Sequence, residues 1–410
     1  MLNGNRHTCR VCGKADLEVF LDLGNSPLAD RLLTKAQLEE KEPMYPLQVA
    51  FCRNCTLVQI LETVDPEELF CRDYPYYSSV SSSLLEHSRQ NVLELIARRR
   101  LGPQSFVVEL ASNDGYLLRN YVDVGIPCLG IDPAQGPAQA AERIGVPTRC
   151  TFFNEDLARS LCAEGKKADV IHANNVLAHV ADTNGFVEGI RQLLRDDGVA
   201  VIEVPYVKNL IDHCEFDTIY HQHLCYFSVT ALDHLFRRHD LYLNEVRPLA
   251  IHGGSLRLYV EPHEAVTSSV RDYLADEKAC GADTFEYYCR FAQAVANIKD
   301  RLRSLLTSLK SDQRRIMAYA AAAKGCTLLN YVGIDRNWVE AIVDKNPHKQ
   351  GKYMTGMHQP ILPTEQVLER MPDYLLLLAW NFKDEIMSQQ REYVARGGRF
   401  IIPIPEPVIV

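Results

Sequence analysis

The chain has 410 residues, of which 47% are hydrophobic and 24% are charged, and these ordinary globular values exclude a disordered or fibrous chain. A single hydrophobic core stops growing at roughly 250–300 residues, so we expect two or three domains. The 44 basic and 53 acidic residues leave a net charge of −9, which argues against a nucleic-acid partner because such proteins usually carry a basic face.

Targeting and membrane segments are not evident in the sequence. It lacks the charged start, apolar stretch and cleavage site of a secretory signal. The longest apolar runs, such as residues 374–380, are too short to span a membrane. We therefore expect a cytoplasmic protein without a membrane partner, and its 13 cysteines should stay reduced rather than form disulfides.

The first segment, residues 1–72, is rich in turn-forming residues and too small to bury a core of its own. It contains two CxxC pairs, formed by Cys9 with Cys12 and by Cys52 with Cys55. This spacing lets both thiolates of a pair bind one tetrahedral ion, and four thiolates leave no open position for a substrate. We therefore predict a structural zinc site that stabilises this domain. A redox function is less favoured, because redox CxxC pairs do not usually occur twice outside a thioredoxin-like pattern.

The second segment, residues 73–262, alternates apolar runs with amphipathic helical patterns. We expect strands at 106–110, 127–132, 148–152, 169–173 and 199–204, and helices at 116–122, 137–144, 156–163 and 186–194. Such alternation with short connections predicts a parallel sheet with helices on both faces. A further helix at 231–239 and strands at 241–246 and 255–261 predict an antiparallel extension of that sheet.

The third segment, residues 263–410, begins with a charged, proline-free stretch up to residue 315 that predicts one or two long linker helices. Alternation then resumes and predicts a second, smaller α/β unit. Its strands are expected at 316–320, 339–343, 374–379 and 399–404, and its helices at 324–331, 364–371 and 385–396. The predicted fold class is therefore α/β, with two sheet domains after a small N-terminal domain.

The turn after the first strand of the central segment predicts a cofactor site, because a doubly wound sheet binds ligands outside the carboxyl ends of its strands. Ala111 and Asn113 stand where a dinucleotide-binding loop has glycines, and the acidic side chains of Glu109 and Asp114 would repel a phosphate. Asp132, at the end of the next strand, can accept hydrogen bonds from two ribose hydroxyls. The pattern favours a cationic, phosphate-free nucleoside such as S-adenosylmethionine, and capping and turn chemistry is the alternative explanation of the acidic pair. The residues expected to contact this cofactor are Glu109, Ala111, Asn113, Asp114, Gly115, Asp132 and Asn174.

Two further groups of polar residues follow strands of the central segment. Asn174 and Asn175 end the strand at 169–173, and His179 follows them; their place at the binding edge favours function over turn chemistry. Later, the sequence Tyr-His-Gln-His at 220–223 gathers groups suited to acid–base catalysis near neutral pH. The alternatives are surface histidines or a second metal site, since residues 221 and 223 would share one face of a strand. No third ligand is evident nearby in the sequence.

These motifs together carry a resemblance that covers essentially the whole chain. The chain is similar to the nucleotide-sugar C-methyltransferases of deoxysugar biosynthesis, especially the C-3 enzymes that act on 4-keto-6-deoxy sugars. The shared motifs are the paired CxxC, 24–29 (Gly-Asn-Ser-Pro-Leu-Ala), 74–79 (Tyr-Pro-Tyr-Tyr-Ser-Ser), 109–115, 174–179, 220–223, 252–255 (His-Gly-Gly-Ser) and 323–325 (Ala-Lys-Gly). Several separate motifs in the right order make this resemblance specific.

The resemblance implies a three-domain enzyme. A zinc-binding N-terminal domain would pack beside a Rossmann-like methyltransferase domain that uses S-adenosylmethionine. A C-terminal Rossmann-like domain would complete the nucleotide-sugar site, and the zinc would be structural. The resemblance also implies a nucleotide-linked keto sugar of the dTDP or GDP type as substrate, and a monomer or weak dimer.

The resemblance further implies roles for individual residues. His223 matches the family's candidate base, which would remove the proton next to the C-4 ketone. Tyr220 and Tyr76 would hydrogen-bond the keto oxygen or the ring, and Asn175 and His179 match positions that line the sugar pocket. The carbanionic carbon would then attack the sulfonium methyl in line.

Gln222 departs from the family, which commonly has glutamate at this position. A carboxylate can hold an amino group or raise the basicity of a neighbouring histidine, whereas an amide does neither as well. We hypothesise that the acceptor carries a hydroxyl rather than an amino group beside the reacting carbon. A second possibility is that methylation occurs at another carbon, such as C-5.

The nucleotide half of the substrate is assigned to the third segment and its junction with the second. An alanine-rich turn before Lys324 lets a phosphate approach the start of a helix, and the lysine adds positive charge. Close strand–helix packing with a solvated lysine explains the spacing equally well, and the resemblance favours nucleotide contact. His252 and Arg257 lie between the two sheet domains in sequence and are expected to line the cleft. Trp380 and Asn381 end a strand at the same edge, where a core tryptophan is the alternative.

Two other classes of function agree less well with the sequence. A zinc-ribbon nucleic-acid methyltransferase is disfavoured by the acidic charge and by the lack of an Arg-rich stripe. A non-catalytic nucleotide-sugar-binding protein is disfavoured by the cofactor turn and by His223.

Overall fold

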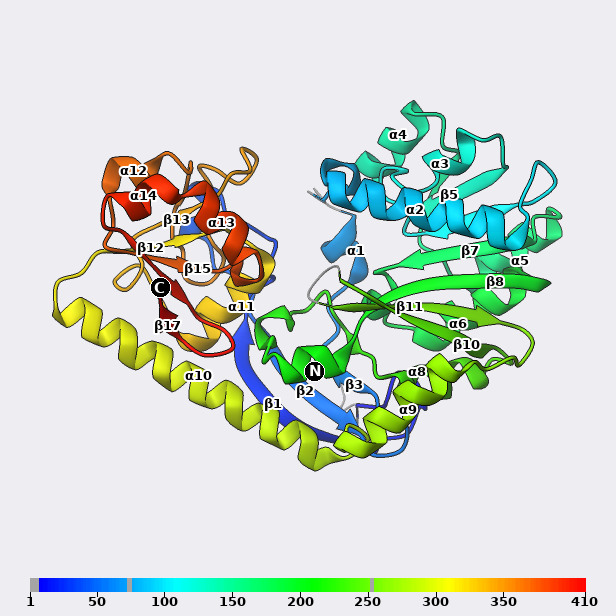
Figure 1. The fold of residues 1–410 in the computed structure, drawn as a ribbon, viewed down its shortest axis with the longest axis horizontal. Coiled ribbons are helices and arrows are strands. Elements are labelled where there is room, and N and C mark those ends of the chain that lie inside the picture. Colours follow the sequence, from blue (N-terminus) through cyan, green and yellow to red (C-terminus); the bar gives the residue numbers. More distant parts are fainter. Residues whose placement is uncertain (1–6, 72–75, 251–253) are drawn as a thin grey trace.

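The computed structural model describes residues 7–71, 76–250 and 254–410, so that the predicted substrate residue His252 lies outside the described residues. The described chain forms three sheets. In Figure 1 the two larger sheets stand on opposite sides of the molecule, with the N-terminal sheet and the long helix α10 (Phe285–Ser311) beneath and between them. The N-terminal sheet region therefore reaches both α/β units.

The smallest sheet combines the N-terminal segment with two residues of the central one. Its strands, all antiparallel to their neighbours, follow the order β1 (Leu17–Ser26), β2 (Tyr45–Cys52), β3 (Val58–Ile60) and β9 (Cys225–Tyr226). Alternating residues of β2, such as Leu47 and Val49, are fully buried and give the sheet an apolar face. Helix α1 (Pro66–Phe70) follows, and the Asp65 side chain caps it by accepting a hydrogen bond from the Glu67 amide.

The central sheet has seven strands in the order β10–β11–β8–β7–β4–β5–β6. They are β4 (Val107–Leu110), β5 (Cys128–Asp132), β6 (Thr148–Cys150), β7 (Ala168–Asn174), β8 (Leu194–Pro205), β10 (Tyr242–Leu249) and β11 (Ser255–Glu261). Strands β4 to β8 are parallel, whereas β11 is antiparallel to β8 and β10, which confirms the predicted antiparallel extension. From β4 the chain builds outward to β6 and then returns to β7 on the other side of β4. The carboxyl ends of β4 and β7 are therefore the switch point at which such sheets bind ligands.

Helices cover both faces of the central sheet (Figure 1). Val107 and Val108 of β4 point to opposite faces, and each belongs to a different apolar cluster, so both faces of the sheet are buried. The helices of the central segment are α2 (Ser82–Arg99), α3 (Arg119–Val122), α4 (Gln135–Arg143), α5 (Glu155–Ala163), α6 (Thr183–Leu193), α7 (Val207–Asp212) and α8 (Val229–Arg237). Helix α2 is absent from the sequence prediction, since two of its buried residues, Ser88 and Asn91, are polar and weaken the apolar periodicity.

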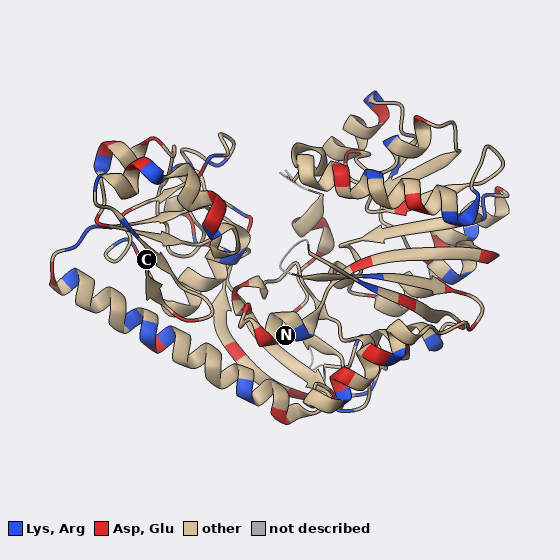
Figure 2. Ribbon diagram, in the orientation of Figure 1, with Lys and Arg blue, Asp and Glu red and all other residues tan. Residues whose placement is uncertain are grey.

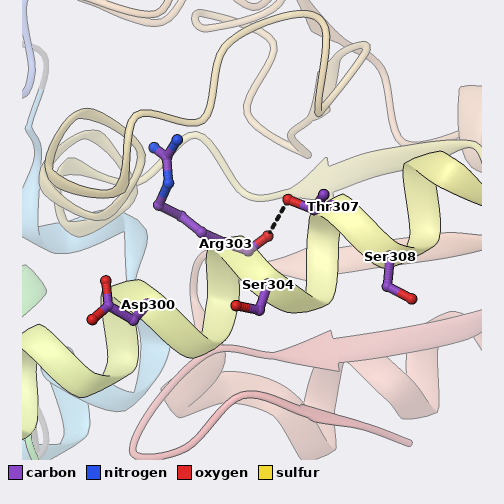
Figure 3. Close-up of a pocket in the computed structure, with 5 residues that line it drawn as sticks. All are labelled: Asp300, Arg303, Ser304, Thr307 and Ser308. Atoms are coloured by element: carbon purple, nitrogen blue, oxygen red, sulfur yellow. Dashed lines mark hydrogen bonds between the residues drawn. The ribbon is translucent and has the colours of Figure 1, made fainter.

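The predicted linker is formed by two helices, α9 (Ser268–Cys280) and α10. Figure 2 shows both basic and acidic residues along α10. The Arg303 guanidinium of α10 donates to the Val332 carbonyl at 2.6 Å, which ties the linker to the C-terminal unit. Five α10 residues line a pocket, shown in Figure 3, that includes none of the predicted site residues: Asp300, Arg303, Ser304, Thr307 and Ser308.

The C-terminal sheet has six strands in the order β14–β13–β12–β15–β16–β17. They are β12 (Ile316–Tyr319), β13 (Ile342–Val343), β14 (Ile361–Leu362), β15 (Tyr374–Leu377), β16 (Arg399–Ile402) and β17 (Val408–Ile409). Neighbouring strands are parallel except β16 and β17, and the switch point lies between β12 and β15. Its helices are α11 (Ala323–Val332), α12 (Gln366–Arg370), α13 (Lys383–Gln389) and α14 (Arg391–Ala395). None of the helices in the described ranges is long and apolar enough to cross a membrane.

Candidate functional site

The four predicted zinc ligands come together beside the N-terminal sheet. The sulfur atoms of Cys9, Cys12, Cys52 and Cys55 all lie within 4.8 Å of one another. Gly13, at φ +72°, closes the first turn by donating its amide to the Cys9 carbonyl. A closed set of four thiols suits structural zinc. Hydrogen bonding to Cys52 raises the pKa of Cys9 to about 12, and a bound cation would reverse this shift by stabilising the thiolates.

The carboxyl ends of β4 and β5 bring the predicted cofactor residues together. Asp132 accepts hydrogen bonds from the amides of Asn113 and Ala134, both at 2.8 Å. Ala111, Asn113 and Gly115 have φ values of +57°, +49° and +77°, a left-handed conformation that costs glycine much less than other residues. The turn therefore follows a glycine-like path although only one of these three residues is glycine, and such strain clusters at functional sites.

Buried acidic side chains lie together at this edge. Glu109 is only 1% exposed, and burial, together with the nearby Asp132 carboxylate, raises the pKa of Glu109 well above its ordinary value. One buried side-chain oxygen each of Asp114 and Asn174 lacks a hydrogen-bond partner within the described chain. Buried polar atoms are nearly always satisfied in a complete assembly, so these atoms mark a place that a ligand completes. The ribose and the cationic sulfonium of S-adenosylmethionine match this edge, and the bound cofactor supplies an electrophilic methyl group.

The cofactor turn also holds the segment that carries Tyr76. The Asn113 side chain accepts a hydrogen bond from the Ser78 amide at 2.9 Å and donates one to the Tyr76 carbonyl at 3.1 Å. Asp114 accepts from the Ser79 amide at 3.1 Å. These side chains therefore have a structural task that the sequence does not reveal, because the partners lie 35 positions apart. The contacts place Tyr76, 48% exposed, at the rim of the cofactor edge.

Three of the predicted catalytic side chains meet in one cluster next to the end of β7. The ring centres of His179 and His223 are 4.9 Å apart, and those of Tyr220 and His223 are 4.2 Å apart. Nδ1 of His179 donates to the Gln222 carbonyl at 2.7 Å, and Nδ1 of His223 donates to the Thr218 carbonyl at 2.8 Å. A carbonyl only accepts hydrogen bonds, so the His223 ring in its neutral form carries its proton on Nδ1 and its lone pair on Nε2. Nε2 of His223 is therefore a basic atom of fixed orientation.

The other two side chains of the 220–223 segment are buried. Nε2 of His221 donates to the Pro46 carbonyl at 3.1 Å, and the ring lies 5.7 Å from that of Tyr45. His221 thus holds the segment against the N-terminal sheet, and among the described residues it belongs to no group placed to hold a metal. Gln222 is 7% exposed, and its Oε1 lacks a hydrogen-bond partner within the described ranges.

Arg257, predicted to bind substrate, is committed to an ion pair inside the central sheet. Its Nη2 lies 2.7 Å from the Glu203 carboxylate, and the two residues are 6% and 0% exposed. His87 of α2 lies 3.0 Å from the same carboxylate, and the Asn175 amide donates to the Glu203 carbonyl at 2.8 Å. The network therefore fixes the end of β7, and a substrate contact by Arg257 stays a prediction. The sequence signal for Glu203 was an acidic residue within the apolar strand at 199–204.

Lys324, Trp380 and Asn381 come together at the C-terminal switch point. The Lys324 ammonium donates to Asn381 Oδ1 at 3.0 Å and lies 4.4 Å from the Trp380 ring centre. A Cβ atom at Gly325 would lie only 2.9 Å from Leu378. The small residues of this turn therefore allow close strand–helix packing, while the lysine charge stands at the edge of the sheet.

Comparisons with known proteins agree with this architecture. A zinc binding domain matches residues 9–70, a methyltransferase domain matches 84–246, and a C-methyltransferase C-terminal domain matches 250–405. The fold and site thus define a methyltransferase that uses S-adenosylmethionine and binds zinc through its N-terminal domain. C-methyltransferase NovU of Streptomyces niveus is 34% identical over 405 residues, which cover 98% of this chain and 96% of NovU. The chain belongs to this family of C-methyltransferases.

Solved structures resemble part of the chain. A chain in the complex of the Haloferax volcanii Trm112 activator with a methyltransferase has a TM-score of 0.36 at 18% identity, covering 44% of this chain and 93% of that chain. Magnesium protoporphyrin IX methyltransferase from Synechocystis PCC 6803, with bound SAM, has a TM-score of 0.34 at 12% identity, covering 44% of this chain and 81% of that chain. Scores this low support no conclusion about the site.

Proposed function

We propose that this C-methyltransferase acts on a nucleotide-linked 4-keto-6-deoxy sugar and methylates it at C-3. The observation that carries the proposal is the cluster of His179, Tyr220 and His223 next to the end of β7, one of the two strands that form the switch point of the central sheet. A carbon next to a ketone carries an acidified proton. A neutral imidazole of fixed tautomer is suited to remove such a proton near neutral pH.

In this proposal the reaction divides into proton removal and methyl transfer. His223 Nε2 takes the proton from C-3, and the electron pair moves to the C-4 oxygen as an enolate. The bond from Nδ1 to the Thr218 carbonyl stabilises the imidazolium that forms, and Tyr220 and Tyr76 hydrogen-bond the enolate oxygen. Bound S-adenosylmethionine would supply the methyl group that the enolate accepts at C-3, and its sulfur would leave as a neutral thioether. The acidic surroundings of Glu109 favour the sulfonium cation over this product.

The nucleotide, of the dTDP or GDP type, is assigned to the C-terminal edge. Arg257 is neutralised by Glu203 at 2.7 Å, so the positive charge for a diphosphate falls chiefly to Lys324. We further propose that the enzyme is cytoplasmic, a monomer or weak dimer, and binds neither nucleic acid nor membranes.

Gln222 is proposed to select a sugar with a hydroxyl beside the reacting carbon. Its Oε1 is buried and lacks a partner in the described part of the chain, and a neutral amide serves a hydroxyl better than an ammonium group. In Gln222→Glu, preference should shift by about tenfold toward the matched amino sugar, measured as kcat/KM for both substrates. An unchanged preference would contradict the assignment.

The main test is incubation with nucleotide-linked 4-keto-6-deoxy sugars and S-adenosylmethionine in heavy water. Deuterium incorporation at C-3 and a mass gain of one methyl group support the proposal, and both should be lost in His223→Asn. His213→Asn is the matched control, because the His213 side chain is 58% exposed. Exchange at C-5 alone would replace the C-3 assignment, and neither exchange nor transfer across the panel would overturn the sugar substrate.

A further inference from the structure

The loop that carries His223 is attached to the C-terminal domain through two buried hydrogen bonds. Trp380 Nε1 donates to Asp217 Oδ2 at 2.8 Å, and Thr327 Oγ1 donates to the Ile219 carbonyl at 2.9 Å. Asp217 and Thr327 are 0% and 2% exposed. The bonds join residues 163 and 108 positions apart, so no pattern in the sequence could have shown them.

One bond reaches the turn that orients the base, and the other reaches Ile219, the residue directly after that turn. The 3-10 turn Phe216–Thr218 ends in the residue whose carbonyl accepts the Nδ1–H of His223 at 2.8 Å. The turn's phenylalanine ring lies 5.4 Å from that of Tyr331 on α11, which adds a third contact with the C-terminal domain. Any displacement of the turn moves the acceptor that selects the His223 tautomer.

We propose that Trp380 and Thr327 are positioning residues, through which the C-terminal domain sets the orientation of His223. This inference rests on the proposed role of His223 as the base. The C-terminal domain would then use the edge formed by Lys324 and Trp380 for two tasks, nucleotide binding and orientation of the base. Lys324, 4.4 Å from the Trp380 ring, would hold the nucleotide, and Trp380 itself would hold the turn beneath the base. The sugar and the base would thereby be placed by the same rigid unit, as alignment of reacting groups requires.

Two conservative variants test the proposal. Trp380→Phe and Thr327→Val each remove one donor with little change in volume, and each should lower kcat by about tenfold or more. The KM for the sugar and the affinity for S-adenosylmethionine should change less than twofold, roughly. Trp338→Phe is the matched control, since Trp338 packs on Arg303 of the linker helix and should keep wild-type kcat.

Variants of Asp217 test the same hydrogen bond from the side of its acceptor. Asp217→Asn keeps an oxygen that accepts the indole N–H and should retain most of kcat, whereas Asp217→Ala should resemble Trp380→Phe. The double variant Asp217→Ala with Trp380→Phe should be no worse than either single variant, because the two act through one bond. Additive losses would overturn the assigned bond.

A measurement without substrate separates this inference from the proposed function. NMR of enzyme labelled in its histidine rings reports the tautomer of His223, with His223→Asn identifying its signals. We expect the Nδ1–H form in the wild type and a tautomer mixture in Trp380→Phe and Thr327→Val. Unchanged His223 signals and unchanged kcat in both variants would overturn the positioning role. Proton exchange that survives in His223→Asn would instead overturn the proposed base.

Discussion

The two large sheets brace their ligand-facing turns in the same way. In the central sheet, Asp132 accepts the amide of Asn113 at 2.8 Å. In the C-terminal sheet, Asp344 accepts the amide of Ala321 at 2.7 Å. In both cases the other carboxylate oxygen accepts the amide two residues further along the chain. The acidic residue after the neighbouring strand is thus part of the scaffold of each edge.

The surroundings of the two turns differ in charge. The central turn lies beside the buried Glu109. The C-terminal turn lies beside two cations, because Lys349 donates to the Ala321 carbonyl at 2.7 Å and Lys324 stands at the start of α11. We propose that the same backbone device serves ligands of opposite charge, a sulfonium at one edge and a diphosphate at the other. The brace occurs in both sheets and so belongs to the fold, and we propose that the neighbouring charges select the ligand.

The largest effect should follow loss of the zinc site, which tests whether the central edge is independent of the N-terminal sheet. Structural zinc contributes about 10–16 kcal/mol to the folding of small zinc domains, so chelation or Cys52→Ser should unfold the sheet that supports β9 and His221. Activity should be lost, while calorimetry should still detect S-adenosylmethionine binding. Cys289→Ser, at an exposed cysteine, is the control. Loss of cofactor binding as well would show that the edge is not independent.

The matched pair Asp132→Asn and Asp344→Asn tests the shared brace. An amide oxygen accepts only one of the two backbone hydrogen bonds well, so each variant should lower the free energy of unfolding by about 1–3 kcal/mol. Only Asp132→Asn should lower the affinity for S-adenosylmethionine, by at least about tenfold. Thermal unfolding and calorimetry measure the two quantities. An equal loss of cofactor affinity in both variants would contradict the assignment of the cofactor to the central edge.

Glu109 should make cofactor binding depend on pH. Burial raises the pKa of Glu109, and the bound sulfonium favours its carboxylate, so binding releases a proton and the affinity for S-adenosylmethionine rises with pH. The free energy of unfolding of the unbound protein has the opposite trend. The folded state binds the extra proton, so stability falls as pH rises from the ordinary glutamate pKa toward the raised one. Both slopes should flatten in Glu109→Gln, measured by titration calorimetry and thermal unfolding, and a slope that persists would contradict this assignment.

The smallest expected effect is that of Lys324→Met at the C-terminal edge. Loss of one charge–phosphate contact should raise KM for the nucleotide sugar by about tenfold. The affinity for S-adenosylmethionine should not change, because this cofactor is assigned to the other edge. Lys383→Met, at an exposed lysine of α13, should leave both values unaltered. A similar rise in the control would assign the effect to general charge rather than to this site.

Local patterns were sufficient to predict the elements that depend on nearby residues. The CxxC spacing predicted the zinc ligands, and apolar alternation predicted the strands of the central sheet, including the antiparallel β10 and β11. In the C-terminal sheet it predicted β12, β13, β15 and β16 but not the two-residue strands β14 and β17. The position of Asp132 at the end of its strand predicted that it lies at the carboxyl edge of the central sheet, next to the turn after β4. Helix α2 escaped prediction because polar Ser88 and Asn91 interrupt its buried face.

The partners of individual side chains were decided by the tertiary structure. By itself, the sequence determined which residues could ionise, bind metal or carry a proton, since those properties belong to the side chain. It could not determine that Arg257 pairs with Glu203, that His221 meets Pro46, or that Trp380 meets Asp217. Hydrogen bonds and ion pairs act over a few ångströms, and only folding of the chain brings these residues, 54 to 175 positions apart, within that range.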